Sequence, residues 1–507
     1  MESAAKSLSD PTTSCCGTCG CRAAVGVDPC VSDSIAEFLS DGARLHSLVD
    51  SLGSPLNIVF PQRPLDNLET FESALAARRV QGRVLCTTKP NKSKAILSSL
   101  ARAGAAADVS SVGALNHALS CGVAPSRIQA TGPKTIEYLS LAMAHGCFIT
   151  VDSLEEFQAL LAVKRQLPHA SAARALVRVM GKRSPFHASQ QITTTFGCSP
   201  GELGELLGSI RQQSGLVSLE GFHFHLHGAV NSERRDTFQV AFGALRQARA
   251  MGLSPRIINV GGGYKIRYAK DYQQWARFQA YLKASVRGET KPITWQGSGL
   301  GFSLGPNGIT GAPHYLDHAP ESFGAKEFAE LLDMRCPELD DQPVFQVASD
   351  ALLDLWVEPG RAAFDQAGIS VGRITHTQQR SGEKPLIRVE MNQSNLRSSQ
   401  QKLLTQPIFV ARGERRPSPQ GMFLIGNLCL SQDLLQHNTV YPGFVPEAGD
   451  LVVFINTAPY LMDFIESPML HQPVARKLAA VRGRSGWRTM LDDQYSPVRF
   501  DLEEGLA

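Results

Sequence analysis

Short apolar runs alternate with longer amphipathic stretches between about residues 50 and 265. The runs predict buried strands at 83–88, 148–152, 175–180, 221–226 and 257–260. Stretches rich in Ala and Leu predict helices at 93–103, 154–165 and 237–251. Strands that alternate with such helices form βα units around a parallel sheet. The number of units favours a (β/α)₈ barrel, and a doubly wound sheet is the alternative.

The alternation breaks between residues 264 and 345. This segment contains Trp275, Trp295 and a glycine-rich run at 297–311. The run lacks the Lys-Ser/Thr ending of a nucleotide-binding phosphate loop. We therefore interpret 264–345 as an insertion between barrel strands, and long insertions in barrels tend to lie over the active site.

The pattern changes again after about residue 373. Short apolar runs at 386–390, 421–425 and 451–455 are separated by turns, which predicts a β-domain. Residues 1–30 are rich in Ser, Ala, Gly and Cys and have no amphipathic period, so we predict that they are disordered. The expected organisation is a tail at 1–30, a barrel domain at 31–372 that carries the insertion, and a C-terminal β-barrel or sandwich at 373–507.

The composition is that of a globular protein. Of the 507 residues, 43% are apolar and 19% are charged, which suits two or three domains with large cores. The net charge of +3 is too small to indicate a nucleic-acid partner. No stretch approaches the ~18–20 apolar residues of a membrane span. The N-terminal residues lack the basic start and apolar run of a secretory signal, which predicts a cytoplasmic protein.

The chain has eleven cysteines, an odd number that excludes complete pairing. Cys16, Cys19 and Cys21 lie close enough together to bind a soft metal. No second pair follows at the spacing of a zinc site, so we interpret the segment as a thiol-rich tail and predict no metal. The cysteines further along the chain are expected to be reduced thiols.

Lys89 follows directly on the strand predicted at 83–88. The carboxyl end of a barrel strand is where barrel enzymes place their chemistry. The amine of Lys89 can form a Schiff base with an aldehyde once desolvation lowers its pKa. Taken alone, a lysine after a strand is more often a solvated loop residue.

Two further motifs follow predicted strands. Gly261, Gly262 and Gly263 follow the strand IINV and would let backbone N–H groups approach a phosphate. Glu358 and Arg361 flank Pro359 and Gly360 after the apolar run ALLDLWV. Arg361 can bind a phosphate through two parallel hydrogen bonds, and Glu358 can bind a protonated ring nitrogen. Either motif alone is also compatible with a turn that binds no ligand.

Three histidines, His223, His225 and His227, share one face if the strand continues through them. A metal site, a stacking interaction with a planar cofactor, and purely structural histidines all stay open at this point. Cys429 lies in the segment 426–433, where a buried core cysteine is the alternative. Tyr460 follows the strand LVVFI, where it can also be a packed aromatic.

In their order along the chain, these motifs resemble those of the pyridoxal-phosphate-dependent decarboxylases related to diaminopimelate and ornithine decarboxylase. The resemblance covers about 50 to 465, and seven motifs in one order make it specific. They are Thr-Lys-Pro-Asn at 88–91, Ala-Asp-Val-Ser-Ser-x-Gly at 107–113, Val-Asp-Ser-Leu-Glu-Glu at 151–156, the His225 segment, the triple glycine, Glu-Pro-Gly-Arg, and Cys-x-Ser-x-Asp.

The resemblance implies a pyridoxal-phosphate-binding (β/α)₈ barrel with a C-terminal β-domain, and it implies roles. Lys89 would carry the cofactor as a Schiff base, His225 would stack on its ring, and Glu358 would keep the pyridine nitrogen protonated. The ring then acts as an electron sink for the carbanion left by CO₂. Cys429 would protonate that carbanion across the interface of a homodimer. The phosphate would be held by Gly261, Gly262, Gly263, Gly360, Arg361 and Tyr460.

The sequence departs from the family where the substrate is bound. Leu430 stands where the diaminopimelate enzymes have Glu, and only Leu-Arg-Ser, containing Arg397, stands for their Arg-Pro-Ala-Leu-Tyr segment. The family's Gly-Ser after the stacking histidine is replaced by His-Gly, and Ala114 stands for an acidic residue. We therefore expect Arg397 and Asp433 on the substrate side of the site, and a substrate other than diaminopimelate.

Two other functions compete with an amino-acid decarboxylase. A racemase on the related barrel is expected to place Arg near the pyridine nitrogen, and Glu358 argues against it. A catalytically inactive regulatory homologue would bind a partner, and the presence of both Lys89 and Cys429 argues against it. The substrate itself is not predicted by the sequence.

Overall fold

A computed structural model describes residues 25–181, 195–226, 228, 230–379, 381–398 and 401–504. The chain forms two compact units, each assembled from separate segments. We call one the barrel unit, which comprises Phe60–Lys265, Ser322–Asp365 and the chain from Asp492 onward. We call the other the sheet unit, which comprises the chain up to Val59, Ile266–Glu321 and Gln366–Leu491.

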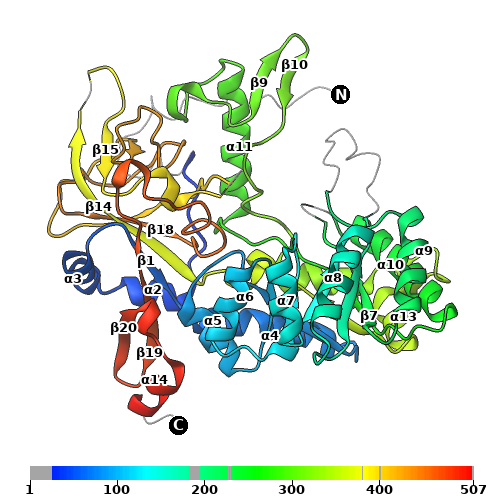
Figure 1. Ribbon diagram of the computed structural model, residues 1–507. Coiled ribbons are helices and arrows are strands. Elements are labelled where there is room, and N and C mark those ends of the chain that lie inside the picture. The colour runs from blue at the N-terminus through cyan, green and yellow to red at the C-terminus, as the bar shows by residue number, and fades with distance from the viewer. Residues whose placement is uncertain are drawn as a thin grey trace. The chain divides into compact units, whose positions relative to one another are not determined.

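Eight parallel strands close into a barrel in the barrel unit (Figure 1), which confirms the predicted fold class. Around the barrel the strands run in chain order, and the last strand pairs with both β8 and β2. The strands are β2 Gly82–Thr87, β3 Ala106–Val109, β4 Ile128–Ala130, β5 Phe148–Val151, β6 Ala173–Arg178, β7 Val217–His223, β8 Ile257–Asn259 and β13 Asp354–Val357.

Several helices of the barrel unit begin directly after a Ser or Thr that caps them. The hydroxyl oxygens of Ser93, Ser111, Thr135, Ser153 and Ser199 each accept a backbone N–H three residues further on. These caps fix where each helix leaves the turn behind its strand. The helices of this unit are α4 Gln62–Ala76, α5 Lys94–Arg102, α6 Val112–Ser120, α7 Ile136–Ala144, α8 Leu154–Gln166, α9 Pro200–Gln212, α10 Asn231–Ala250, α12 Gly324–Asp333, α13 Val344–Asp350 and α14 Pro497–Glu504.

Short elements complete the barrel unit. They are the 3₁₀ turns η1 Pro125–Arg127, η4 Gly360–Phe364 and η7 Asp492–Gln494, and the two-residue strands β11 Arg335–Cys336 and β12 Gln342–Pro343. Figure 1 shows the long helices around the outside of the strands.

Side chains fill the barrel interior. Phe148 and Trp356 meet edge to face with ring centroids 4.7 Å apart, among Leu85, Ala106, Leu176 and Ile257. The guanidinium carbon of Arg174 lies 3.6 Å from the Phe148 ring centroid, and that of Arg83 lies 4.7 Å from the Trp356 ring. The interior is therefore a packed core rather than a channel.

The sheet unit is built on a sheet in the strand order β16-β18-β14-β1-β19-β20, with β15 and β17 attached through β14. Its strands are β1 Leu56–Val59, β14 Gly368–Gln378, β15 Leu386–Val389, β16 Ile408–Val410, β17 Phe423–Ile425, β18 Leu451–Ile455, β19 Arg476–Gly483 and β20 Gly486–Leu491. Its helical elements are α2 Asp33–Leu39, α3 Gly42–Leu52, α11 Tyr272–Val286, η3 Trp295–Gly297, η5 Gln393–Leu396 and η6 Met469–His471. A separate hairpin joins β9 Phe302–Gly305 to β10 Gly308–Gly311.

The two units differ from the contiguous ranges 31–372 and 373–507 that the sequence predicts. Strand β1 lies between β14, antiparallel to it, and β19, parallel to it, so the chain enters the sheet before it forms the barrel. After the last strand the chain returns to the barrel unit, where the Asp492 carboxylate accepts the backbone N–H groups of Lys94 and Ala95. Long-range pairing of this kind leaves no mark in a local hydrophobic pattern.

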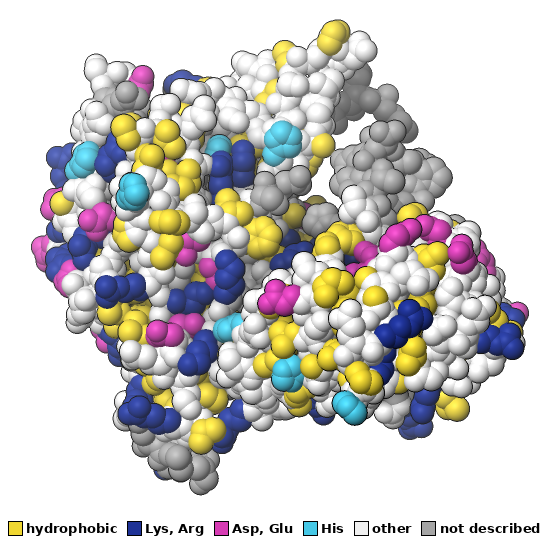
Figure 2. All heavy atoms as spheres, in the orientation of Figure 1, with side chains coloured by type: hydrophobic (Ala, Val, Ile, Leu, Met, Phe, Trp, Pro, Cys, Tyr) yellow, Lys and Arg dark blue, Asp and Glu magenta, His cyan; other side chains and the backbone are white. Residues whose placement is uncertain are grey.

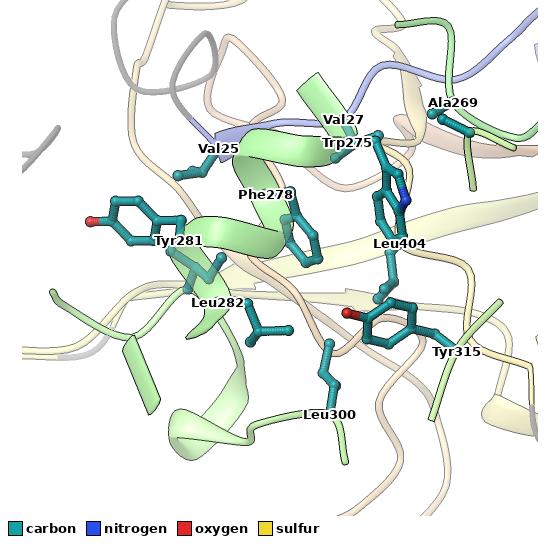
Figure 3. Close-up of a cluster of buried hydrophobic side chains, with 12 residues drawn as sticks. Val25, Val27, Ala269, Trp275, Phe278, Tyr281, Leu282, Leu300, Tyr315 and Leu404 are labelled. Atoms are coloured by element: carbon teal, nitrogen blue, oxygen red, sulfur yellow. The ribbon is translucent and has the colours of Figure 1, made fainter. Parts of the chain in front are cut away.

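The segment predicted as an insertion does lie between two barrel strands, β8 and β13. Residues 266–321 of it belong to the sheet unit. Trp275, Phe278 and Leu282 of α11 pack there against Tyr315 and Leu404 in a buried cluster (Figure 3). The reason is hydrophobic: one face of α11 is apolar, and burial in this core removes it from water.

Part of the predicted disordered tail is ordered. Residues 25–30 are described, and Val25 and Val27 are buried in the same cluster as Trp275 (Figure 3). The Cys30 N–H donates to Tyr268 O at 2.7 Å. The prediction of disorder for 25–30 is therefore wrong. It rests on the average composition of residues 1–30, whereas the two valines supply the apolar contacts that order the end of this segment. The remainder of the tail lies outside the described residues.

None of the described helices is both long and apolar enough to cross a membrane. On the face in Figure 2, Lys and Arg side chains are interspersed with acidic and apolar ones rather than gathered in one patch.

Candidate active site

Lys89 lies just beyond the carboxyl end of β2, in an exposed turn. The preceding residue ties this turn to the next strand, because Thr88 donates both its N–H and its Oγ1 hydroxyl to Asp108 O, at 3.0 and 3.2 Å. Burial raises the pKa of two carboxyls, Asp108 and Glu358, and the positive charge of Lys89 offsets part of that rise in both. Lys89 is therefore close enough to both carboxyls for its charge to act on them.

Glu358 directly follows β13 and is nearly fully buried. Its Oε1 accepts hydrogen bonds from Asn259 Nδ2 at 2.8 Å and from Gln129 Nε2 at 3.2 Å. Asn259 Nδ2 also donates to Gln129 Oε1 at 2.8 Å, so the three side chains form a closed network across the barrel. Such a network fixes the carboxyl in one orientation.

Burial raises the pKa of Glu358, and the amide donors partly offset that rise because they favour the charged form. Asp108 lies at the end of β3, and burial together with the charge of Glu358 raises its pKa well above its usual range. The Thr131 hydroxyl donates to Asp108 Oδ1 at 2.6 Å. Burial therefore favours the neutral form of both carboxyls, although the Thr131 hydrogen bond favours the charged form of Asp108.

The three histidines predicted on one face have different surroundings. His223 is buried at the end of β7, with Nε2 3.3 Å from Glu358 Oε1 but without a hydrogen bond. Burial, followed by the charges of Arg178 and Lys134, lowers the pKa of His223 well below its usual value. It is therefore neutral, and its contact with Glu358 is not an ion pair. His227 lies outside the described residues.

His225 follows β7 and is half-buried. The N–H of Gly262 donates to His225 Nδ1 at 3.1 Å, so Nδ1 is an acceptor and Nε2 carries the proton of the neutral ring. This bond fixes the plane of the imidazole against the glycine turn. A ring fixed in this way is suited to packing flat on a planar ligand.

The turn after β8 needs glycine at each position. Gly261 and Gly263 have φ values of +66° and +92°, which favour glycine. A Cβ on Gly261 would lie 2.2 Å from Phe224 O, and one on Gly262 would lie 2.3 Å from Glu358 O. The turn therefore approaches its neighbours as closely as backbone allows.

Only part of this turn is available as a donor. Gly261 N–H is used by Asn259 Oδ1 at 2.8 Å, and Gly262 N–H by His225. Gly263 N–H makes no hydrogen bond within the described part of the chain. The sequence suggested three N–H groups for a phosphate, whereas two of them hold the neighbouring side chains in place.

Gly360 and Arg361 open the turn η4 directly after Glu358. Gly360 has a φ of +60°, and Arg361 is half-buried. Because Glu358 N–H donates to Gly261 O at 3.0 Å, the turns after β8 and β13 are joined side by side. The backbone of Gly263 and Gly360 and the Arg361 guanidinium thus belong to adjoining turns at one end of the barrel.

A buried ion pair between Arg234 and Glu327 holds the glycine turn in place. Arg234 on α10 is fully buried and donates to Gly263 O at 3.0 Å and to Gly262 O at 3.4 Å. Its Nη1 lies 3.3 Å from Glu327 Oε1, and Glu327 Oε2 accepts the Lys265 N–H at 2.8 Å. The sequence offered no signal for this pair, whose members are far apart in the chain.

We predict that Arg234→Met destabilises the protein by about 3–5 kcal/mol, because it leaves Glu327 buried without its buried partner. The variant should also bind the ligand of the glycine turn more weakly. Lys265 is the matched control: its Nζ lies 3.7 Å from the same Glu327 oxygen, but its side chain is 46% exposed. Lys265→Met should cost about 1 kcal/mol or less. Chemical unfolding of both variants measures the difference, and equal losses would contradict the assignment.

Tyr460 lies in the sheet unit, after β18. Its φ of +72° is unusual for a residue with a bulky side chain. Its ring meets Phe464 edge to face with centroids 5.4 Å apart, and Tyr460 N–H donates to Ala458 O at 3.0 Å. A strained backbone that the surroundings maintain is typical of functional positions.

Cys429 is exposed in a loop of the sheet unit that Asp433 closes. The Asp433 carboxylate accepts the N–H of Leu428 at 2.9 Å and that of Gln393 at 2.8 Å. Gly426 N–H donates to Asp433 O at 2.8 Å, and a Cβ on Gly426 would clash with the same carboxylate. Asp433 therefore shapes the loop that presents Cys429.

Arg397, half-buried just after η5, donates to Gln393 Oε1. The structure thus brings Lys89, His225, the three glycines, Glu358, Gly360 and Arg361 to one end of the barrel unit. Tyr460, Arg397, Cys429 and Asp433 belong to the sheet unit.

Sequence reasoning missed four residues of the barrel network: Asn259, Gln129, Asp108 as a titrating group, and Arg234. A signal existed for two of them, because Asn259 and Gln129 are polar residues inside short apolar strands. A polar side chain that a strand buries needs a partner. Among the described residues no group of three His, Cys, Asp or Glu could hold a metal ion, and the cysteine run before residue 25 lies outside them.

The donor set fits a flat, phosphorylated ring with a basic nitrogen. The buried Glu358 carboxyl can bind a ring N–H, the oriented His225 can pack on a ring face, and Gly263, Gly360 and Arg361 offer donors for a phosphate. The exposed Lys89 amine completes the set with a group that can bond to an aldehyde carbon.

Residues 66–290 match the family model described as "Pyridoxal-dependent decarboxylase, pyridoxal binding domain". Over 480 residues, 93% of the chain, the sequence is 28% identical to an uncharacterised protein, y4yA, of Sinorhizobium fredii, of which it covers 98%. It is 21% identical to the diaminopimelate decarboxylase of Staphylococcus aureus, with 84% of this chain and 88% of that protein covered.

Solved structures share the fold. The diaminopimelate decarboxylase of M. jannaschii, in complex with L-lysine, matches with a TM-score of 0.66 at 16% identity, covering 88% of this chain and 91% of that one. The arginine decarboxylase of Paramecium bursaria Chlorella virus matches with a TM-score of 0.62 at 14% identity, covering 87% and 100%. The predictions of the family and of pyridoxal phosphate as cofactor are confirmed.

Proposed function

Because residues 66–290 match the pyridoxal-dependent decarboxylases, we propose that this chain removes CO₂ from an amino acid or amino-acid conjugate other than diaminopimelate. The observation that carries the proposal is the match at 66–290, which contains Lys89, His225 and the glycine turn. The buried carboxyl network around Glu358 completes the site at β13. The relatives named above do not agree on one substrate.

The cofactor supplies an electron sink that stabilises the carbanion left when CO₂ departs. Lys89 Nζ is the proposed point of attachment, since its turn is fixed to β3 through Thr88. Glu358 would hold a proton on the ring nitrogen, because its carboxyl is buried and oriented by Asn259 and Gln129. His225 would cover one face of the ring and exclude water from it.

The phosphate would lie against Gly263, Gly360 and Arg361, while Gly261 and Gly262 shape the cradle and hold Asn259 and His225. Tyr460 would contribute its hydroxyl from the sheet unit. The Cys429 thiol would return a proton to the substrate carbon, and Asp433 sets the loop on which it lies. In the family this thiol comes from the partner subunit, so we propose a homodimer with composite sites.

Trapping the CO₂ released from a panel of amino acids by purified holoenzyme tests the proposal. The panel contains L-lysine, L-ornithine, L-arginine, meso-diaminopimelate, L-glutamate and the side-chain N-succinyl conjugates of L-lysine and L-ornithine. We expect CO₂ from at least one member at a rate that scales with enzyme concentration. Absence of release from all of them, with the cofactor demonstrably bound, would contradict a decarboxylase of this substrate class.

We predict that Lys89→Ala and Cys429→Ala, each of which forms little of the correct product alone, regain correct product formation when their subunits are mixed. Random re-association makes half of the dimers hybrids, and one of the two sites in each hybrid has both residues intact. Roughly a quarter of the wild-type activity should return. Mixing each variant with itself is the control. A fully active monomer at high dilution would rule out shared sites.

We predict that meso-diaminopimelate is a poor substrate. Its distal end carries an ammonium group and a carboxylate, and Leu430 can neither accept a hydrogen bond from the ammonium nor offset its charge. Loss of one or two such contacts should lower kcat/KM by ~10²–10⁴-fold. Steady-state assays beside the other panel members measure this. A kcat/KM for diaminopimelate above all others would overturn the inference from Leu430.

A further inference from the structure

A cluster of basic side chains lies near the Cys429 loop, and it consists of the cations Arg397 and Lys402 and the neutral imidazole of His437. Gln436 Nε2 donates to Leu403 O at 3.1 Å and to Thr405 O at 2.7 Å. Asn438 Nδ2 donates to Leu404 O at 3.0 Å. These bonds join the segments 403–405 and 436–438, which places Lys402 and His437 at neighbouring positions. Both side chains are half-buried.

Arg397 is attached to the loop of Cys429 through Gln393. Its guanidinium donates to Gln393 Oε1, and the N–H of Gln393 donates to Asp433 Oδ1 at 2.8 Å. The other carboxylate oxygen of Asp433 holds the N–H of Leu428, the neighbour of Cys429. Arg397 is therefore fixed relative to the thiol by a short series of hydrogen bonds within the sheet unit.

The charged groups that act on Lys402 and His437 are cations, whereas the one that acts on Arg397 is the acid Asp433. Burial and the charge of Arg397 lower the pKa of Lys402. Burial and the charges of Lys402 and Arg397 lower the pKa of His437 to about 4. Among the described residues none of the three has an ion-pair partner. Asp433 acts on Arg397 at a distance, but both of its oxygens already accept backbone N–H groups.

Half-buried cations without a counter-ion are unfavourable unless an anion joins them. The fork of Arg397 suits a carboxylate, and Lys402 adds a point charge beside it. Leu430 beside Cys429 is apolar and 47% exposed, so it offers an ammonium group no acceptor. The charge balance near Cys429 therefore favours an anionic ligand.

Resting on the proposed function, we propose that Arg397, Lys402 and His437 form the subsite for the distal end of the substrate, and that this end carries carboxylate. The substrate class is then an amino acid, or a conjugate of one, whose far end is anionic rather than cationic. His437 lies in this subsite as a neutral donor that can take up a proton when the anion binds.

Calorimetric titration of holoenzyme with glutarate, pentane-1,5-diamine and inorganic phosphate tests the charge of the subsite. We expect glutarate to bind at least ~10-fold more tightly than the diamine. Arg397→Gln and Lys402→Gln should each weaken glutarate by ~10–100-fold, the loss expected for one charge-assisted contact. Arg476→Gln is the matched control, since Arg476 is an exposed cation of the same unit. It should leave the affinity unchanged.

The charge reversal Lys402→Glu should shift the preference towards the diamine, and this variant tests the idea even if another fails to fold. Tighter binding of the diamine by wild type would overturn the proposal. Binding of phosphate in place of glutarate, with the same dependence on Arg397 and Lys402, would also overturn it by assigning the cluster to a phosphate group. Retention of glutarate affinity in both glutamine variants would do the same.

The panel of CO₂ assays separates this inference from the proposed function. Faster release from the members with an anionic distal end than from L-lysine supports both. Faster release from L-lysine keeps the decarboxylase and contradicts the anionic subsite. Absence of release from every member, together with glutarate binding that depends on Arg397 and Lys402, upholds the anion site and contradicts the decarboxylase.

Discussion

Replacing Lys89 by alanine is expected to lower kcat by ~10⁴-fold or more, the scale seen when a covalent catalytic residue is lost. The physical reason is that the exposed Lys89 amine lies in the turn that Thr88 ties to β3, where its charge acts on both Asp108 and Glu358. The variant should bind the cofactor reversibly, without the visible absorbance of a covalent link. Single-turnover CO₂ release and absorbance spectra measure both effects.

Lys92 provides the control for this variant, because it is an exposed lysine three residues further along the same turn. Lys92→Ala should keep its colour and a rate close to that of wild type. If Lys89→Ala retained more than a hundredth of the wild-type rate, Lys89 would not be the attachment point.

Replacing Cys429 by alanine is expected to lower the rate of correct product formation by ~10²–10⁴-fold, the usual contribution of a positioned acid. Cofactor binding should be unaffected, since the described phosphate and ring ligands of the barrel unit do not include this loop. CO₂ should still be released, but the proton should arrive from the wrong donor. The product would then show the wrong stereochemistry in deuterated water, or the cofactor would be lost by abortive transamination.

Product analysis by NMR and parallel CO₂ trapping distinguish these steps. Cys30→Ala, which alters another cysteine of the sheet unit, is the control and should behave as wild type. Loss of cofactor binding in Cys429→Ala would contradict a role that is limited to proton return.

The barrel could be predicted because its signal is local. Each buried strand is an apolar run, and each following helix begins at a Ser or Thr cap that the sequence displays, as at Ser93 and Ser153. The composition of the sheet unit could not be predicted, because β1 pairs with β14 and β19, more than 300 residues away in the chain. Pairing over that distance depends on the whole fold and not on a window of sequence.

In the site, too, residues with a local sequence signal could be predicted, and residues that act through distant partners could not. Motifs could predict Lys89, His225 and Glu358 as candidates, since each lies within two residues of the end of a barrel strand. The residues that orient them could not be predicted, because Arg234 acts through Glu327 and Gln129 acts through Asn259, and each such pair is distant in sequence. The use of Gly261 and Gly262 N–H groups by neighbouring side chains also depends on geometry that no motif encodes.

The most direct test of the account is to reduce the holoenzyme with borohydride and map the modified peptide by mass spectrometry. Reduction makes the bond between an enzyme lysine and the cofactor permanent, so the mass increment marks the lysine that carries it. The account predicts a single modified peptide that contains Lys89, and none in Lys89→Ala. Modification of a different lysine, or a holoenzyme that gives no modified peptide, would contradict it.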